Sequence, residues 1–311
     1  MALPNGWLGA DRNFLALDEP WCHPDVAGVR VLPAPYEHTS SYIQGSDRGP
    51  EAIIEASQQV ELYDEVLGLE AYREWGGIAT SIPLNLDGKV DGAAVEAIQA
   101  FVQPHVRTDR FVVTLTGEHT GALGAIRAHA KAWPNLCVVQ IDAHGDLRQA
   151  YQGNPYSHAS VMARVVDDGL PLVQVGVRSI SPEEIELIEK TKTITTFFAS
   201  QICDPSGPYE GRAANWVPEV VRACRGPVYL TFDCDGLDPS LVPALGTPEP
   251  GGLGWYDTLT LVNALARGPG IVGMDISEIA PIEGFAAPQF AVARLIYRIL
   301  SRICAARRNN L

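Results

Sequence analysis

The stretch that decides the fold is Gln140-Ile141-Asp142-Ala143-His144-Gly145-Asp146. It completes an apolar run, 136–141, which predicts a buried strand. Side chains at alternate positions of an extended backbone point to the same face, so Asp142, His144 and Asp146 can converge on one point. Two carboxylates and an imidazole are costly to bury together unless a cation lies between them. We therefore predict half of a metal site at the end of this strand.

The overall composition is that of a soluble globular protein. The 311 residues are 46% hydrophobic and 19% charged, which is enough for a sizeable core. The formal net charge of −14 argues against nucleic acid or an anionic membrane surface as a partner. It suits a small cationic substrate, although acidic charge also serves solubility alone.

Cysteine usage and the absence of targeting segments indicate a location. The six cysteines are scattered without a CxxC pair, which predicts a reducing compartment and thiols used as small core residues. The N-terminus lacks the basic and apolar regions of a signal peptide, and no apolar run is long enough to cross a bilayer. We expect a cytoplasmic protein.

Short apolar segments alternate with amphipathic ones along most of the chain. Strands are expected at 29–32, 111–115, 136–141, 172–177, 194–198, 228–232 and 271–276. Helices are expected from residue 50 and at 92–102, 121–132, 160–168, 182–190, 216–223, 258–266 and 290–305. This alternation predicts an α/β fold with a central, mainly parallel sheet, in one domain over 28–311. Residues 1–27, irregular and interrupted by Pro and Gly, are expected to form an N-terminal arm.

Polar residues follow four of these strands at their carboxyl ends, where open α/β sheets bind ligands. They are His119, Asp142 to Asp146, Asp233 to Asp235, and Glu278. Four aspartates carry −4, which two divalent cations would balance, and oxygen-rich ligands suit Mn²⁺ or another first-row ion better than structural zinc. The alternatives are that the first acids cap the next helix and that Asp-Gly-Leu-Asp-Pro is a turn sequence.

Several segments together resemble the ureohydrolases, the arginase/agmatinase family. They are TGEH (116–119), DAHGD (142–146), SHAS (157–160), FDCDGLDPS (232–240), GTPEPGGL (246–253) and ISEIAP (276–281), with GSDRGP (45–50) upstream and APQFAVARLIYRIL (287–300) downstream. The resemblance implies a three-layer α/β/α fold of the arginase/deacetylase type and a single catalytic domain. It also implies two Mn²⁺ ions per subunit, hydrolysis of a guanidino group to urea and an amine, and a homo-oligomer, either a trimer or a hexamer.

The resemblance also assigns roles to residues. His119, Asp142, Asp146 and Asp233 would bind one metal ion, and Asp142, His144, Asp233 and Asp235 the other. Glu278 matches the acid that pairs with the substrate guanidinium, and His158 matches the histidine that carries a proton; Asp146 would also stabilise the tetrahedral intermediate. For His158 the structural alternative is a loop histidine bonded to backbone, and for Glu278 it is a surface acid.

The resemblance leaves open which guanidino compound is the substrate. The segment DLRQAYQGNPYSHASVMARV (146–165) is most similar to bacterial and archaeal agmatinases, which implies cleavage of agmatine to urea and putrescine. Arg148 stands where arginases have an Asn, which counts against arginine. An Arg148 side chain in the pocket would favour a guanidino acid such as 4-guanidinobutyrate, whereas pairing with a rim acid would leave agmatine favoured. Guanidine is a further alternative.

Two other classes of protein are weighed beside the ureohydrolase. A metal-dependent deacetylase of related architecture would hold one zinc ion and cleave an amide. A catalytically silent homologue would act as a binding or regulatory protein. The full set of six expected ligands together with Glu278 favours urea release. Glu118 replaces the Asp that is usual in the family, and we expect this change to leave the ligand set intact.

Overall fold

The computed structural model describes residues 3–204, 206–208 and 213–308. Its described residues form one sheet of eight parallel strands, in the order β2-β1-β3-β8-β7-β4-β5-β6. The strands are β1 (Val29–Ala34), β2 (Ile78–Thr80), β3 (Phe111–Thr116), β4 (Cys137–Ile141), β5 (Leu172–Val177), β6 (Ile194–Phe198), β7 (Val228–Asp233) and β8 (Ile271–Ser277). Every expected strand is present; the short edge strand β2 was not predicted.

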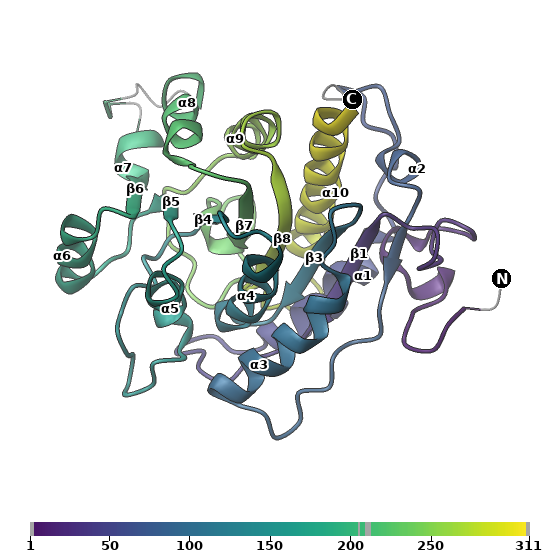
Figure 1. The fold of residues 1–311 in the computed structure, drawn as a ribbon, viewed down its shortest axis with the longest axis horizontal. Helices are drawn as coiled ribbons and strands as arrows, with labels where there is room; N and C mark the ends of the chain where they lie inside the picture. The colour runs from purple at the N-terminus through teal and green to yellow at the C-terminus, as the bar shows by residue number, and fades with distance from the viewer. Residues whose placement is uncertain (1–2, 205, 209–212, 309–311) are drawn as a thin grey trace.

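Helices cover both faces of the sheet and complete three layers (Figure 1). One face carries α3 (Asp91–Val102), α4 (Ala122–Ala132) and α5 (Val161–Asp167). The other carries α1 (Gly49–Ser57), α8 (Ala213–Ala223), α9 (Trp255–Arg267) and α10 (Ala287–Arg308). Three further described helices are α2 (Ala71–Glu74), α6 (Pro182–Lys190) and α7 (Ala199–Ile202). The prediction of a three-layer α/β/α fold is confirmed.

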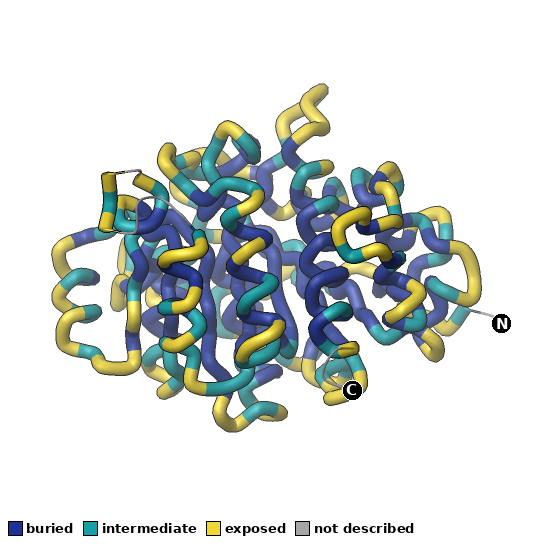
Figure 2. Tube along the Cα trace, turned by 90° about the horizontal axis from the view of Figure 1, so that it is seen from above, coloured by how far each residue is buried: buried dark blue, intermediate teal, exposed yellow. Residues whose placement is uncertain are grey.

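The central strands are apolar runs because both of their faces are covered. All residues of β1, β3, β4, β5 and β7 are buried. Figure 2 shows these strands as buried tubes beneath helices whose outer sides are exposed. Parallel strands covered on both faces do not alternate between apolar and polar residues, so a polar residue within one needs a specific partner.

The order of the strands determines where a ligand can bind. Strand β3 pairs with β8, and β4 pairs with β7, so the chain crosses two strand positions between β3 and β4 and fills them later. The carboxyl ends of β3, β8, β7 and β4 therefore lie next to one another. These are the four strands that the predicted polar residues follow, and a reversal of strand order opens a crevice at this edge.

The described part of the N-terminal segment packs on the edge of the sheet. It contains the 3-10 helices η1 (Ala10–Arg12) and η2 (Phe14–Ala16), and Phe14 is fully buried. The side chain of Asn13 accepts a hydrogen bond from the Thr80 N–H (2.8 Å) and donates one to the Ile78 carbonyl (2.9 Å). The segment is irregular as expected, and it contributes to the core. The division of the chain into an N-terminal arm, 1–27, and one catalytic domain, 28–311, stays a prediction.

All six cysteines lie in the described part of the chain and are free thiols, and four of them are buried. They serve as small core residues, as the sequence predicted. Within the residues that the structure covers, no helix is both long and apolar enough to span a membrane.

We predict that Asn13→Ala destabilises the protein by about 2 kcal/mol, because it leaves buried backbone groups of β2 unpaired. The measurement is the midpoint of guanidinium unfolding in the metal-free protein. The control is Asn135→Ala, since Asn135 is exposed. Equal midpoints for the two variants would contradict a structural role for the N-terminal segment.

Candidate metal centre and active site

Six side chains gather at the carboxyl edge of the sheet. His119 begins the 3-10 helix η5 (His119–Gly121) after β3, and Asp233 ends β7 before the 3-10 helix η7 (Cys234–Gly236). The others are Asp142, His144 and Asp146 after β4, and Asp235 in η7. Five of the six are buried, and the His144 side chain is 27% exposed. The structure thus brings together all six residues that the sequence proposed as ligands.

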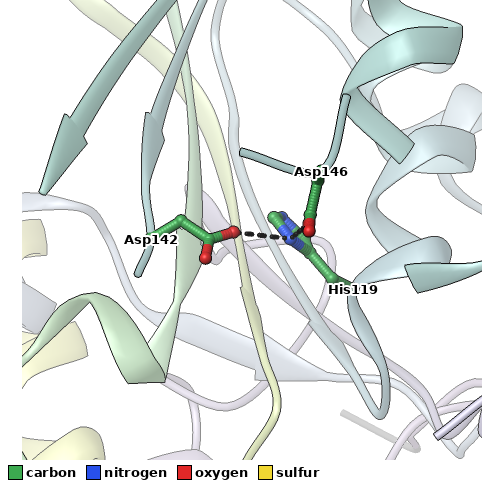
Figure 3. A group of neighbouring side chains, drawn as sticks. All are labelled: His119, Asp142 and Asp146. Atoms are coloured by element: carbon green, nitrogen blue, oxygen red, sulfur yellow. Dashed lines mark hydrogen bonds and ion pairs between the residues drawn. The ribbon is translucent and has the colours of Figure 1, made fainter. Parts of the chain in front are cut away.

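His119 lies against three of the carboxylates. Its Nδ1 is 2.8 Å from an Asp146 oxygen, 3.1 Å from an Asp142 oxygen and 3.5 Å from an Asp233 oxygen. Figure 3 shows the imidazole between Asp142 and Asp146. The His119, Asp142 and Asp146 ligand atoms all lie within 4.8 Å of one another.

His144 forms a second group with the same central carboxylate. Its Nδ1 is 2.9 Å from an Asp235 oxygen and 3.5 Å from an Asp142 oxygen. Asp142, His144 and Asp235 also place their ligand atoms within 4.8 Å of one another. Asp142 therefore belongs to both groups, through a different oxygen in each.

The partner of the other His119 nitrogen shows what this cluster fits. Thr231 donates its hydroxyl proton to Asp275 (3.0 Å), so at 2.8 Å it can only accept from Nε2 of His119. A neutral His119 then carries its proton on Nε2 and presents the lone pair of Nδ1 to carboxylate oxygens. Hydrogen-bond acceptors that face one another require a cation or a proton between them. A histidine that binds a metal through one ring nitrogen usually donates a hydrogen bond from the other, as His119 does here. The donor set fits a pair of divalent cations.

A buried chain of amides holds Asp142. Gln140 donates to an Asp142 oxygen (2.7 Å), and Gln174 donates to Gln140 (2.6 Å) and to the Gly145 carbonyl (2.7 Å). Thr196 donates to Gln174 (2.8 Å). The central carboxylate is thereby fixed from strands β4, β5 and β6.

Local backbone geometry directs the remaining ligands. Asp146 has φ of +51°, and its carbonyl accepts from the N–H groups of Met162 and Ala163 at the start of α5. Alternation along an extended strand was expected to aim this residue, but a left-handed conformation does so. Asp233 both faces His119 and accepts a hydrogen bond from the Asp235 N–H (2.9 Å). A turn and a metal ligand were alternative predictions for this segment. They are compatible, because one Asp233 oxygen accepts the hydrogen bond of the turn and the other faces His119.

Burial of these charges displaces their titration in the protein without metal. Burial, together with the Asp142 charge, raises the pKa of Asp146 to about 7, and it raises the pKa of Asp233 well above its usual range. Burial alone would lower the pKa of His144, but hydrogen bonds to Asp142 and Asp235 raise it to about 12. The cluster therefore takes up protons when no cation is bound.

A cavity of about 320 Å³ opens beside the cluster and contains the other predicted site residues. Glu278 (φ +66°) accepts from the His119 N–H (2.7 Å), and burial and the Glu118 charge raise its pKa. Burial lowers the pKa of His158. Arg148 lies 3.9 Å from Glu184 and 5.6 Å from the Tyr151 ring centroid. The cavity wall thus carries both a positively charged side chain, Arg148, and acidic side chains.

Several supporting residues were missed at the sequence level. Thr231, Asp275, Gln140 and Gln174 are polar residues within buried apolar strands, and that contrast is the signal that could have identified them. Glu118 lies outside the ligand cluster and accepts a hydrogen bond from Thr39 instead. That its presence leaves the ligand set intact stays a prediction.

Comparison with known proteins gives the family. The Arginase family profile matches residues 27–301. The chain is 38% identical to an N(1)-aminopropylagmatine ureohydrolase of Synechocystis sp., over 96% of each chain. It is 31% identical to an agmatinase of Bacillus cereus, covering 84% of this chain and 87% of that one. The agmatine ureohydrolase of Thermoplasma volcanium superposes with a TM-score of 0.80 at 27% identity, over 92% of this chain and 93% of the other.

The chain belongs to the arginase family. It is a ureohydrolase that acts on guanidino C–N bonds, most similar to the agmatinases and N(1)-aminopropylagmatine ureohydrolases. The family is one of binuclear metal hydrolases, and the histidine–aspartate cluster could bind such a metal pair.

We predict that His119→Ala and Asp235→Ala each lose bound metal and most activity, because each removes one ligand of a group. Metal content after gel filtration and urea release in Mn²⁺ are the measurements. Full activity of either variant in saturating Mn²⁺ would contradict the site.

We also predict that metal binding releases protons, because ligands bind in their deprotonated forms. His144, with a pKa of about 12, contributes a proton throughout the neutral range. Asp146, with a pKa of about 7, contributes one only where it is protonated, so more protons leave at about pH 6 than at about pH 8. Affinity therefore falls more steeply with acidification below pH 7. Calorimetry in buffers of different ionisation enthalpy measures this; equal release at both pH values would contradict it.

Proposed function

We propose that the cluster holds two Mn²⁺ ions and that the enzyme hydrolyses an aminoalkylguanidine, N(1)-aminopropylagmatine in preference to agmatine. His119, Asp142, Asp146 and Asp233 would hold one ion, and Asp142, His144, Asp233 and Asp235 the other. Their oxygen-rich chemistry supports manganese. The observation that supports this substrate is the 38% identity, over nearly the whole chain, to the N(1)-aminopropylagmatine ureohydrolase of Synechocystis sp.. A trimer or hexamer stays a prediction.

The products follow from the chemistry of the substrate. Water adds to the guanidino carbon, and the bond from that carbon to the substituted nitrogen breaks. N(1)-aminopropylagmatine then yields urea and spermidine, and agmatine yields urea and putrescine. A pair of divalent cations, when bound, supplies hydroxide near neutral pH by lowering the pKa of coordinated water. This matters because a resonance-stabilised guanidinium is a poor electrophile.

Glu278 would hold the guanidinium beside the metal centre. It is half-buried and lines the cavity wall, and its Oε1 accepts a hydrogen bond from the His119 N–H (2.7 Å). Gly246 lies beside Oε2 of Glu278, and a Cβ atom at position 246 would be 3.7 Å from this oxygen. A guanidinium that donates two N–H groups to such a carboxylate is both paired and oriented.

His158 would carry the proton that the leaving amine needs. It lines the same cavity as Glu278 and the ligand cluster. A histidine at this place can take a proton from the attacking water and pass it to the departing nitrogen, which leaves the enzyme unchanged. Asp146 lines the cavity as well and would stabilise the tetrahedral intermediate.

The walls of the cavity support a cationic tail. Glu184 and Glu249 line it, and the chain carries a net charge of −14. Arg148 lines it too and favours a second candidate, a guanidino acid such as 4-guanidinobutyrate. The proximity of Arg148 to Glu184 and its stacking on Tyr151 reduce its pull on a carboxylate, so the polyamine is the stronger proposal.

We predict that kcat/KM for urea release is highest for N(1)-aminopropylagmatine, then agmatine, and at least tenfold lower for 4-guanidinobutyrate, arginine and guanidine. The tenfold difference corresponds to about 1.4 kcal/mol of lost charge pairing. Arg148→Gln should leave the polyamine values equal or higher. A preference for 4-guanidinobutyrate that Arg148→Gln removes would instead establish the guanidino acid as the substrate.

A further inference from the structure

A chain of hydrogen bonds connects a buried carboxylate to His158. Glu118 is fully buried, and its Oε2 accepts from the N–H groups of His38 (2.7 Å) and Thr39 (2.6 Å). Its Oε1 accepts from the Thr39 hydroxyl (2.8 Å). The same hydroxyl oxygen lies 3.0 Å from both the backbone N and the ring Nδ1 of His158. One hydroxyl thus joins the carboxylate to the imidazole.

The hydroxyl of Thr39 has one proton and two lone pairs, and each of them is used. The Glu118 carboxyl oxygens accept from three donors, two backbone N–H groups and the Thr39 hydroxyl, so the Thr39 proton points to Glu118. The lone pairs are left for the two nitrogens of His158, both of which must then donate. The neutral ring consequently carries its proton on Nδ1.

We infer that Glu118 and Thr39 are positioning residues that fix His158 in its Nδ1–H tautomer and leave Nε2 as the nitrogen facing the cavity. We name Glu118, Thr39 and His158 the Thr39 relay. The inference rests on the proposed role of His158 as the carrier of a proton. It gives that role a direction, because only a nitrogen with a free lone pair can take a proton.

The Thr39 relay also supports the charged ring. When Nε2 takes the proton of the attacking water, the ring becomes an imidazolium whose Nδ1–H still donates to Thr39. The Glu118 carboxylate stabilises this charge through the hydroxyl. Nε2 then gives its proton to the leaving nitrogen and returns to the starting tautomer. The ring centroids of Tyr151 and His158 lie 5.7 Å apart and their planes meet at 74°. This packing restricts rotation of the imidazole.

The first test removes the hydroxyl. Thr39→Val should lower kcat about 10- to 100-fold with KM nearly unchanged, because the ring loses its orientation. Thr39→Ser, which keeps the hydroxyl, should restore most of kcat. Thr260→Val is the matched control, since it removes an exposed hydroxyl bonded to a backbone carbonyl (2.7 Å) on α9.

A double-mutant cycle separates positioning from structure. In the His158→Ala background, Thr39→Val should have no further effect on kcat, because the residue through which it acts is gone. Loss of kcat by the same factor in both backgrounds would overturn the inference. Metal content and unfolding midpoint are measured for every variant.

The second test reverses the hydrogen bonds without changing shape. In Glu118→Gln the amide oxygen stays with the two backbone N–H groups, so the amide nitrogen donates to Thr39. The hydroxyl must then donate to Nδ1 of His158, which moves the ring proton to Nε2. We expect a loss of kcat comparable to that of Thr39→Val.

The ¹⁵N spectrum of histidine-labelled enzyme at about pH 8, above the usual titration range of histidine, reports the tautomer directly. Nδ1 should be protonated in the wild type and Nε2 in Glu118→Gln, with His158→Ala identifying the signals. An unchanged His158 pattern in Glu118→Gln would overturn the inference. This readout needs no substrate. Absence of urea release from every guanidino compound would therefore defeat the proposed function, while the spectrum still decides the relay.

Discussion

Electrostatic repulsion among four buried aspartates is the constraint on which the rest of the structure depends. Asp142, Asp146, Asp233 and Asp235 are each 5% exposed or less, and they share two histidines. In low dielectric this arrangement is stable only with protons or cations among the oxygens. Protons meet this need in the metal-free protein, where the pKa values of Asp146 and His144 are raised. A pair of divalent cations would meet it in the metal-bound protein. The fold creates this constraint, because it places the carboxyl ends of β3, β4 and β7 at one edge of the sheet.

Two threonine hydroxyls orient the histidines in opposite senses. Thr231 donates to Asp275 and so leaves Nδ1 of His119 for a cation. Thr39 donates to Glu118 and so leaves Nε2 of His158 for the cavity. In each case a buried carboxylate decides the direction of a hydroxyl, and the hydroxyl decides the tautomer. A histidine beside the metal centre and one beside the substrate thereby acquire different chemistry from the same type of support.

The parts of the fold that were predictable are those with strong patterns. Strands β1, β3, β4, β5 and β7 were located because covered parallel strands are continuous apolar runs. β2, α2 and α7 were missed because three or four residues carry no period. The six clustered side chains were identified from their alternation and the resemblance, but the left-handed backbone of Asp146 was not, since it depends on bonds to α5. The position of Arg148 against Glu184 also required the structure, because its partner lies in the separate helix α6.

The most direct test of the account is the stoichiometry and magnetic state of bound Mn²⁺. The chain without metal is titrated with Mn²⁺ and followed by calorimetry and electron paramagnetic resonance. Two ions per chain, with the spectrum of a magnetically coupled pair that Asp142→Ala abolishes, is the predicted result. A single uncoupled ion per chain, or a coupled pair that survives Asp142→Ala, would contradict the assignment of Asp142 as a carboxylate shared by both ions.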